Sequence, residues 1–553
     1  MPRATRAARA TRSTRSIRTG SLLSAVLLTL TAAAATGCSN GGAAGRPQAA
    51  GTAATAPGRG PGAPDPKLDW KSCPPPSAGE DNGGAAKAPG RDWECATLHA
   101  PLDYAHPDGE KIGIAMIRAK ATDPAHRIGS LVFNFGGPGG SGVTTLPAFA
   151  EDYRNLRTRY DLVSFDPRGV GRSSGVRCLD DKELDAYYAA DSTPATKPEQ
   201  TALVGRVEAY AAACRQHSGK VLPYVGTTNA ARDMDLMRQA LGDGKLHYFG
   251  VSYGTELGGV YAHLYPKNVG RALLDAVVDP SSDPVQSALA QARGFQLALG
   301  NYMSACTQTS DNCPTERSIT DLLDRLGKQP IPATGGGTGS PTPGTGGTGG
   351  SGGTGGGREL TRSLATSGIA QALYSKDFWD YLTEGVEDAE NGDGRILLSL
   401  ADAMNGRNQD GHYSSLQASL NAVTCADFAQ RYTAEDIEPK VADFRKASPV
   451  FGDFMAWSLL QCTGWPVKGE WQTPDVSAKG AAPMLVVGNT GDPATPYEGA
   501  RTMARELGEG VGIEMTYRGQ GHGAYDSGNP CVKGAADAYL LDGKVPEPNK
   551  VCS

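Results

Sequence analysis

The sequence predicts an α/β fold in which a mostly parallel sheet carries an inserted helical lid. Short apolar runs alternate with helix-like runs from residue 68 to about residue 280, as expected for parallel strands joined by helices. Long helical patterns without clear strands follow from Val285 to about residue 455, and apolar runs then return. A serine, an acid and a histidine each lie directly beyond one of the apolar runs. The expected strand ends therefore carry chemically active side chains.

The serine lies in Gly250-Val251-Ser252-Tyr253-Gly254, between a strand expected at 246–249 and a helix expected at 255–265. A turn this tight from strand to helix leaves no room for side chains beside the serine, and it exposes the serine hydroxyl. The pattern G-x-S-x-G also occurs around Ser39, Ser173 and Ser351. Only Ser252 has a strand before it and a helix after it, so we predict that Ser252 is a nucleophile.

The acid and the histidine follow Ser252 in the order that an α/β-hydrolase fold requires. Asp492 comes just beyond a buried strand expected at 484–488, and His522 stands between glycines beyond a strand expected at 513–517. We expect the His522 imidazole to accept the Ser252 proton and return it to the leaving group. Asp492 would fix the tautomer and stabilise the imidazolium.

A glycine-rich loop is expected to supply the remaining component of the catalytic site, the hydrogen-bond donors for the oxyanion. An apolar strand expected at 131–135 ends in Gly136-Gly137-Pro138-Gly139-Gly140-Ser141-Gly142. We predict an oxyanion hole formed by the N–H of Tyr253 and that of Gly136 or Gly137. Such a loop could instead hold a phosphate, but it lacks the lysine and hydroxyl residue of a phosphate-binding loop.

Five ordered motifs together resemble one known family. They are the glycine loop at 136–142, Asp166-Pro167-Arg168-Gly169, the serine motif at 250–255, Leu274-Asp275-Ala276-Val277-Val278-Asp279-Pro280, and Gly491-Asp492-Pro493-Ala494-Thr495-Pro496. The chain resembles the secreted tripeptidyl aminopeptidases of actinomycetes, in the proline iminopeptidase branch of the α/β-hydrolases. The likeness runs from about Trp70 to Cys552 and includes the C-terminal segment typical of that group. It implies the same Ser252, Asp492 and His522 triad, with peptides as substrates.

An aminopeptidase must also hold the free ammonium group of its substrate, and a carboxylate is the group best suited to this. The candidates are Glu256, four residues after the nucleophile, and the lid acids Asp377, Asp380 and Glu384. For each of them, the alternative is an ordinary charge on a solvated helix surface.

The N-terminus has the pattern of an export signal. Residues 1–37 combine six arginines and no acid with an apolar stretch, and Cys38 follows a small residue as in a lipoprotein cleavage site. We expect a lipid anchor at Cys38, with ordinary signal cleavage nearby as the alternative. Residues 38–67 are rich in Gly, Ala and Pro and predict a flexible tether. Elsewhere no apolar run approaches the roughly 20 residues that a membrane-spanning helix needs.

The rest of the chain divides into three segments. Residues 68–283 are expected to form the first part of the hydrolase core, 284–455 the helical lid, and 456–553 the second part of the core. Within the lid, residues 334–357 are nearly all Gly, Thr, Ser and Pro and predict a disordered loop. This loop is interpreted as a passive insertion, with a flexible gate over the site as the alternative.

Cysteine number and charge indicate the compartment and the partners. Of eleven cysteines, lipidation of Cys38 would leave ten. Their order suggests the disulfides Cys73–Cys95, Cys178–Cys214, Cys306–Cys313, Cys425–Cys462 and Cys531–Cys552, which an oxidising compartment would allow. Removing residues 1–37 would change the formal charge from −6 to −12, which argues against nucleic-acid binding. The sequence lacks zinc-binding spacings, and we expect no metal, no cofactor and a monomer.

The sequence thus predicts an exported serine exopeptidase, secreted or lipid-anchored outside the cell. It would release short peptides, in particular tripeptides, from free N-termini through an acyl-enzyme. An esterase or lipase on the same scaffold is the main alternative, because the triad alone does not distinguish an ester from an amide. A non-catalytic binding lipoprotein is the second alternative.

Overall fold

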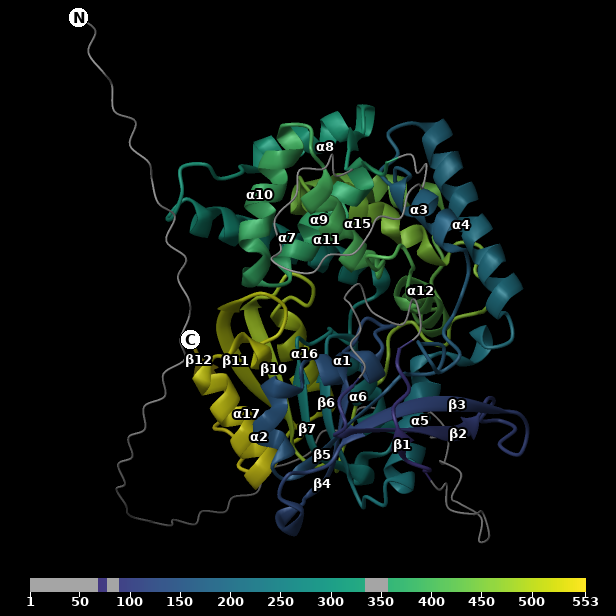
Figure 1. Ribbon diagram of the computed structural model, residues 1–553, viewed down its shortest axis with the longest axis vertical. Helices are drawn as coiled ribbons and strands as arrows, with labels where there is room; N and C mark the ends of the chain where they lie inside the picture. Colours follow the sequence, from purple (N-terminus) through teal and green to yellow (C-terminus); the bar gives the residue numbers. More distant parts are fainter. Residues whose placement is uncertain (1–67, 77–88, 334–356) are drawn as a thin grey trace, which may run out of the picture. The chain divides into compact units, whose positions relative to one another are not determined.

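A ten-stranded sheet forms the centre of the protein (Figure 1). The computed structural model describes residues 68–76, 89–333 and 357–553. The strand order is β1-β2-β3-β5-β4-β6-β7-β10-β11-β12. The strands are β1 (Lys71–Ser72), β2 (Trp93–Pro101), β3 (Lys111–Ala119), β4 (Gly129–Asn134), β5 (Tyr160–Phe165), β6 (Leu246–Val251), β7 (Val269–Asp275), β10 (Met484–Gly491), β11 (Gly512–Gln520) and β12 (Lys550–Cys552).

The sheet is mostly parallel, as predicted. The pairs from β5 through β4, β6, β7, β10 and β11 to β12 are all parallel. Only the edge that contains β1, β2 and β3 is antiparallel. Because β6, β10 and β11 run in the same direction, the residues that follow them meet at one edge of the sheet.

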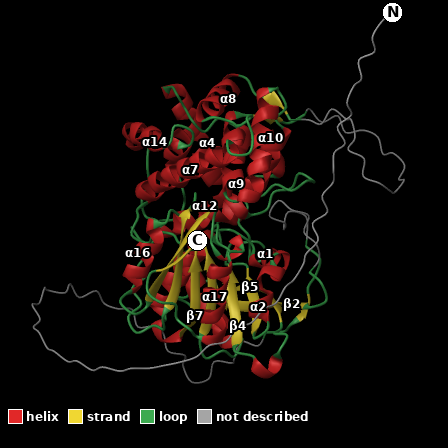
Figure 2. Cartoon of the chain, turned by 90° about the vertical axis from the view of Figure 1, so that its left-hand side faces the viewer, coloured by secondary structure: helices red, strands yellow, loops and turns green. Residues whose placement is uncertain are grey.

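Helices cover both faces of the sheet, which explains why its central strands are largely apolar. One face packs on α5 (Thr227–Ala240), α6 (Tyr253–Leu264) and α16 (Glu498–Leu507). The other packs on α1 (Gly142–Ala148), α2 (Arg154–Arg157) and α17 (Pro530–Asp542). Neighbouring residues of β4 divide between the faces, since Val132 belongs to the first core and Phe133 to the second. Figure 2 shows α16 and α1 on opposite sides of the strands.

A helical cap lies beyond the carboxyl ends of the parallel strands (Figures 1 and 2). Its helices are α3 (Asp181–Ala189), α4 (Lys197–Ser218), α7 (Pro284–Cys306), α8 (Glu316–Lys328), α9 (Arg362–Leu373), α10 (Trp379–Glu390), α11 (Arg395–Asn405), α13 (Ala434–Ile437), α14 (Val441–Ala447) and α15 (Gly452–Ser458). A further helix from the same stretch of chain, α12 (Leu416–Asp427), packs with the sheet core. The cap helices from α7 onward fall in the region, from about Val285, where the sequence predicts long helical patterns.

The cap does not consist of the same segments of chain as the predicted lid. Leu203 and Val207 of α4 pack in the hydrophobic core of the cap, although they precede residue 284. Ala422 and Val423 of α12 pack instead with the sheet core, although they lie within 284–455. Amphipathic patterns predict that a helix has a buried face, but they do not identify the element that covers it.

Two short strands, β8 (Ile331–Pro332) and β9 (Glu359–Leu360), pair antiparallel within the cap, where the sequence predicted none. Each has only two residues, too few for a periodic pattern. The Ala333 N–H donates to the Arg358 carbonyl at 2.9 Å, so the ends of the intervening segment are held together. Residues 334–356, nearly all of the predicted disordered loop, lie outside the described residues.

Replacing residues 334–357 by a short Gly-Ser turn is expected to leave the melting temperature nearly unchanged. The β8–β9 pairing already holds the ends together, and loop-closure entropy changes slowly with length. Thermal unfolding of the shortened protein beside the full chain measures this. A fall of several degrees would show that the tract stabilises the fold.

The structure contains the five disulfides that cysteine order suggested, with S–S distances from 1.98 to 2.09 Å. Cys38, the predicted export signal and the predicted tether lie outside the described residues. Among the helices of the described ranges, none has the length and apolar character needed to cross a membrane.

Candidate active site

Ser252 lies at the sharp turn between β6 and α6, with φ 59° and ψ −126°. Positive φ is rare and strained for a residue with a side chain. A Cβ on Gly250 would come within 2.4 Å of the Gly254 carbonyl oxygen, and one on Gly254 would come within 2.5 Å of the Asn134 carbonyl oxygen. The two glycines are therefore required by close backbone approach, as the sequence predicted.

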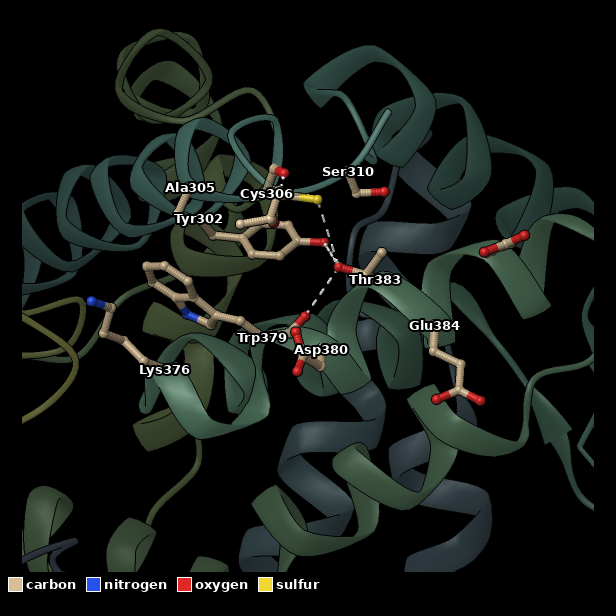
Figure 3. A pocket seen from close by; sticks show the side chains of 11 residues that line it. Tyr302, Ala305, Cys306, Ser310, Lys376, Trp379, Asp380, Thr383 and Glu384 are labelled. Carbon is tan, nitrogen blue, oxygen red and sulfur yellow. Dashed lines mark hydrogen bonds between the residues drawn. The ribbon is translucent and has the colours of Figure 1, made fainter. Parts of the chain in front are cut away.

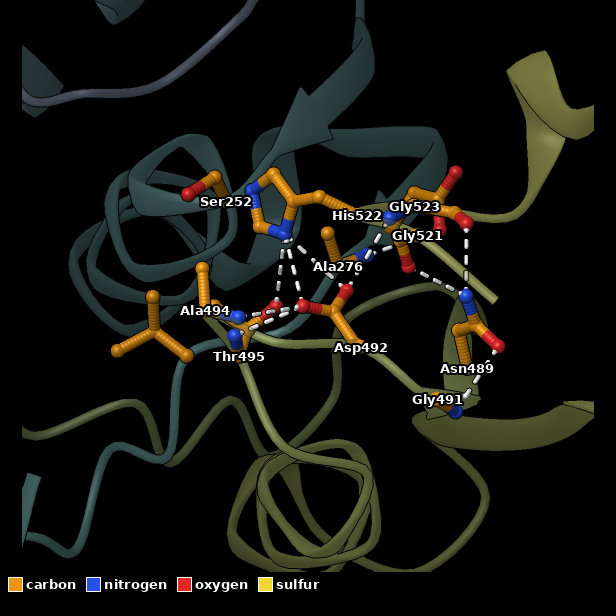
Figure 4. A network of polar contacts seen from close by, with 12 residues as sticks. Ser252, Ala276, Asn489, Gly491, Asp492, Ala494, Thr495, Gly521, His522 and Gly523 are labelled. Atoms are coloured by element: carbon orange, nitrogen blue, oxygen red, sulfur yellow. Dashed lines mark hydrogen bonds and ion pairs between the residues drawn. The ribbon is translucent and has the colours of Figure 1, made fainter. Parts of the chain in front are cut away.

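Asp492 and His522 meet beside this turn (Figure 4). Asp492 directly follows β10, and its Oδ1 and Oδ2 lie 2.9 and 3.1 Å from the His522 Nδ1. The imidazole lies between Ser252 and Asp492, with its other nitrogen on the Ser252 side (Figure 4). Ser252 and His522 form no hydrogen bond with each other here, although such contacts are often long before a substrate binds. The structure thus brings the three predicted residues together.

The histidine loop has little regular structure and is held by hydrogen bonds from outside it. The His522 N–H donates to the Tyr374 carbonyl at 2.8 Å, and the Tyr374 ring packs edge-on against the imidazole at 5.1 Å between centroids. The Asn489 side-chain amide donates to the carbonyls of Gly521 and Gly523 at 2.6 and 3.2 Å. Tyr374 follows α9, so the cap contributes directly to the position of His522.

The Asp492 carboxylate is fully buried and accepts several further hydrogen bonds. The N–H groups of Ala494 and Thr495 donate to Oδ1 at 3.0 and 2.9 Å, and that of Gly523 donates to Oδ2 at 3.1 Å. Burial by itself would lower the pKa of His522, but the charge and hydrogen bond of Asp492 outweigh it and raise that pKa above its usual value. The imidazolium that forms during proton transfer is therefore favoured.

The glycine loop lies against the nucleophile. Of the N–H groups predicted as oxyanion donors, one is already engaged in another hydrogen bond. A Cβ on Gly136 would meet Ser252 Cβ at 2.9 Å and the Tyr253 nitrogen at 3.1 Å. The Gly136 N–H, however, donates to Asn134 Oδ1 at 3.0 Å and is not free for an oxyanion. No described residue accepts from the N–H groups of Gly137 and Tyr253. Between the two predicted glycines, these contacts favour Gly137 as the donor.

Asp166 holds the far end of the glycine loop. This fully buried carboxylate accepts from the Ser141 hydroxyl at 2.6 Å and from the N–H groups of Val143 and Arg172 at 3.1 and 2.8 Å. These bonds fix the turn between β4 and α1.

The four predicted ammonium-binding acids lie in different surroundings. Glu256 is only 5% exposed, and among the described residues it has no hydrogen-bond partner. Asp377 is exposed on the surface of the cap. Asp380 and Glu384 line a pocket of about 430 Å³ beside Tyr302 and Trp379 (Figure 3), and no triad residue lines this pocket.

Glu256 has a carboxyl neighbour that the sequence did not indicate. Burial raises the pKa of Glu256 to about 7. Burial and the charge of Glu256 raise the pKa of Asp427 well above its usual value. Asp427 Oδ1 and Oδ2 accept from the Thr227 N–H and hydroxyl, both at 2.7 Å, and the same hydroxyl lies 2.5 Å from the Tyr253 hydroxyl. Asp427 is at the end of α12, far from Glu256 in sequence, so no local pattern could pair them.

The fold, with Ser252 beyond β6 and the His522–Asp492 pair beside it, defines a serine hydrolase of the α/β-hydrolase fold. The family description "alpha/beta hydrolase fold" matches residues 129–336, and "TAP-like protein" matches residues 448–552. Among curated proteins, serine protease Hip1 of Mycobacterium tuberculosis is 34% identical over 468 residues, covering 83% of this chain and 87% of that protein.

Two further relatives extend the match. Carboxylesterase B of Mycobacterium tuberculosis is 36% identical over 513 residues, with 86% of this chain and 93% of that protein covered. Tripeptidyl aminopeptidase of Streptomyces lividans is 31% identical over 513 residues, with 88% of this chain and 86% of that protein covered. The chain therefore belongs to the TAP-like α/β-hydrolases, which confirms the resemblance seen in its motifs.

Proposed function

We propose that the protein is an exported serine exopeptidase that releases short peptides, in particular tripeptides, from free N-termini. The placement of Ser252 beside the His522–Asp492 pair supports a nucleophilic mechanism. Relatives named serine protease and tripeptidyl aminopeptidase, which match more than four fifths of the chain, support peptides as substrates.

In the proposed mechanism, Ser252 Oγ attacks the scissile carbonyl carbon while His522 Nε2 takes its proton. The Nδ1–H of the resulting imidazolium donates to Asp492, and the N–H groups of Gly137 and Tyr253 donate to the oxyanion. When the tetrahedral intermediate collapses, His522 gives the proton to the departing amine and an acyl-enzyme remains. Water then attacks the ester with His522 again as base, which releases the short peptide and regenerates Ser252.

For the substrate ammonium group we favour Glu256 over the three cap acids. Glu256 lies in the first turn of α6, four residues after Ser252, so it is within a short peptide's length of the nucleophile. Its side chain is buried, no described residue donates a hydrogen bond to it, and its charge raises the pKa of the buried Asp427 carboxyl. A bound ammonium would offset the cost of a buried negative charge at Glu256.

Acetylating the N-terminus of a good tripeptide substrate is expected to reduce kcat/KM at least tenfold. The reason is that losing a charge-assisted contact costs roughly 1.5 to 3 kcal/mol. The Glu256→Gln variant should lose this preference for free amines, whereas Asp380→Asn, which changes a cap acid in the separate pocket, should keep it. Equal hydrolysis of free and acetylated peptides by the unmodified protein would contradict the aminopeptidase proposal and leave serine hydrolysis untouched.

An esterase is the second candidate, because one relative with 36% identity is named carboxylesterase B. Comparing kcat/KM for a tripeptide amide with that for a short acyl ester separates the two. Efficient hydrolysis of the tripeptide amide would support the peptidase. Hydrolysis of the ester but not of the amide would support the esterase.

Export is supported by the arginine-rich apolar N-terminus and by the five disulfides, which persist in oxidising compartments. Lipid attachment at Cys38 is part of the same proposal. Mass spectrometry of the protein purified from membranes tests it, because Cys38 should carry diacylglycerol and form the N-terminus.

A further inference from the structure

Asp275 is a buried carboxylate at the active site that the proposed mechanism does not use. It ends β7, between the nucleophile strand β6 and the acid strand β10, and it is 3% exposed. Its oxygens accept from the Ala524 N–H, 3.0 Å from each, and from the Tyr525 N–H at 2.8 Å. Asp275 therefore binds the backbone two and three residues after His522.

The backbone of the same residue supports the nucleophile. The Ser252 N–H donates to the Asp275 carbonyl at 3.0 Å. The next residue, Ala276, has a φ of 54°, and its N–H donates to Asp275 Oδ1 at 2.8 Å. Asp275 thus contacts both the backbone of the Ser252 turn and the backbone after His522. Positive φ at both Ser252 and Ala276 indicates that the surroundings determine this geometry closely.

The chemistry of these contacts requires a carboxylate. Each partner of the Asp275 side chain is an N–H donor, and an ionised carboxylate offers only acceptors. An asparagine amide would direct its own N–H groups toward one or more of these donors. Asparagine has nearly the same shape as aspartate, so what these contacts require is the acceptor oxygens and the negative charge of a carboxylate.

Asp275 also adds negative charge near the imidazole without touching it. It raises the pKa of His522 in the same direction as the contact with Asp492. The charged neighbours of Asp275 are Asp492, which also faces His522, and Asp526, which also lies near Lys533. Tyr374 and Thr495 also contact the ring and carry no charge.

We propose that Asp275 is a positioning residue for the general base, fixing the loop after His522 relative to Ser252 and supplying a second negative charge that stabilises the imidazolium. This inference rests on the proposed roles of Ser252 and His522, but it is independent of the substrate.

The test is the rate of covalent labelling by a fluorophosphonate, measured against pH in the full chain and in Asp275→Asn. We expect labelling to be slower by about tenfold or more, and the midpoint of its acidic limb to fall by about half a pH unit or more. The sign follows because removing a negative charge lowers the pKa of the histidine, which then loses its proton at lower pH. A purely structural role would slow labelling without moving the midpoint, which would overturn the charge role.

The matched control is Asp161→Asn. Asp161 is also buried and also accepts a backbone N–H, from Ala121 at 2.8 Å. It lies near the start of β5, and therefore at the opposite ends of the parallel strands from the active site. It should lower the melting temperature and leave the midpoint unchanged. Absence of labelling in the unmodified protein would contradict the mechanism itself, whereas equal rates and midpoints in Asp275→Asn would overturn only the inference.

If Asp275→Asn does not fold, Asp275→Glu decides the question, because it keeps the charge and displaces the carboxylate by one methylene. We expect slow labelling with a midpoint near that of the unmodified protein. Unimpaired labelling of Asp275→Glu would overturn the positioning role.

Discussion

Replacing Ser252 by alanine is expected to abolish covalent labelling and to reduce kcat by about three orders of magnitude or more. The hydroxyl is the proposed nucleophile, and neither His522 nor Asp492 can replace it as the acyl acceptor. The fold should persist, since the Ser252 side chain makes no hydrogen bond with any described residue and its backbone contacts are kept. Steady-state kinetics, labelling and circular dichroism on the purified variant measure these effects.

Ser173 is the matched control, because it also lies in a G-x-S-x-G pattern. Its buried hydroxyl donates to the Asp166 carbonyl at 2.7 Å and accepts from the Ala115 N–H at 2.8 Å. Ser173→Ala should therefore lower stability, by about 1 to 3 kcal/mol, and leave labelling at Ser252 intact. Near-normal turnover in Ser252→Ala, or loss of labelling in Ser173→Ala alone, would show that the nucleophile has been assigned to the wrong serine.

The strand ends that carry the site could be predicted because their signals are local. Gly250 and Gly254 mark the turn at Ser252, and apolar runs locate the strands before Asp492 and His522. A parallel sheet then brings these strand ends to one edge without further information. The predicted strand boundaries differ from β6, β10 and β11 by a few residues, but the residues beyond them are placed correctly.

Contacts between distant segments could not be predicted from such signals. Tyr374 reaches His522 from the cap, and Asp427 reaches the surroundings of Glu256 from the end of α12. Asp275 was visible in a motif, but an acid at a strand end has no pattern that distinguishes a positioning residue from a solvated one. The sequence could not exclude the Gly136 N–H as an oxyanion donor, because its bond to Asn134 depends on a side-chain rotamer.

Asp492→Asn should reduce kcat by up to about four orders of magnitude while leaving the chain folded. Asparagine offers one acceptor oxygen in place of two, and its NH₂ group would face either the His522 Nδ1 or the N–H groups of Ala494, Thr495 and Gly523. If it donates to Nδ1, it favours the tautomer whose proton is on Nε2, and that tautomer cannot accept the Ser252 proton. Stability should fall by about 1 to 3 kcal/mol, because a buried donor loses its acceptor.

The pH profile of Asp492→Asn separates the charge of Asp492 from its effect on the tautomer. Without the carboxylate the pKa of His522 falls, so the acidic limb of kcat/KM should move to lower pH, and the lost rate should not return at any pH because the tautomer is still wrong. The double variant with Asp275→Asn should then lose little further rate, since the base is already misdirected. If Asp492→Asn instead kept a near-normal rate that the double variant lost, Asp275 rather than Asp492 would be the acid on which His522 depends.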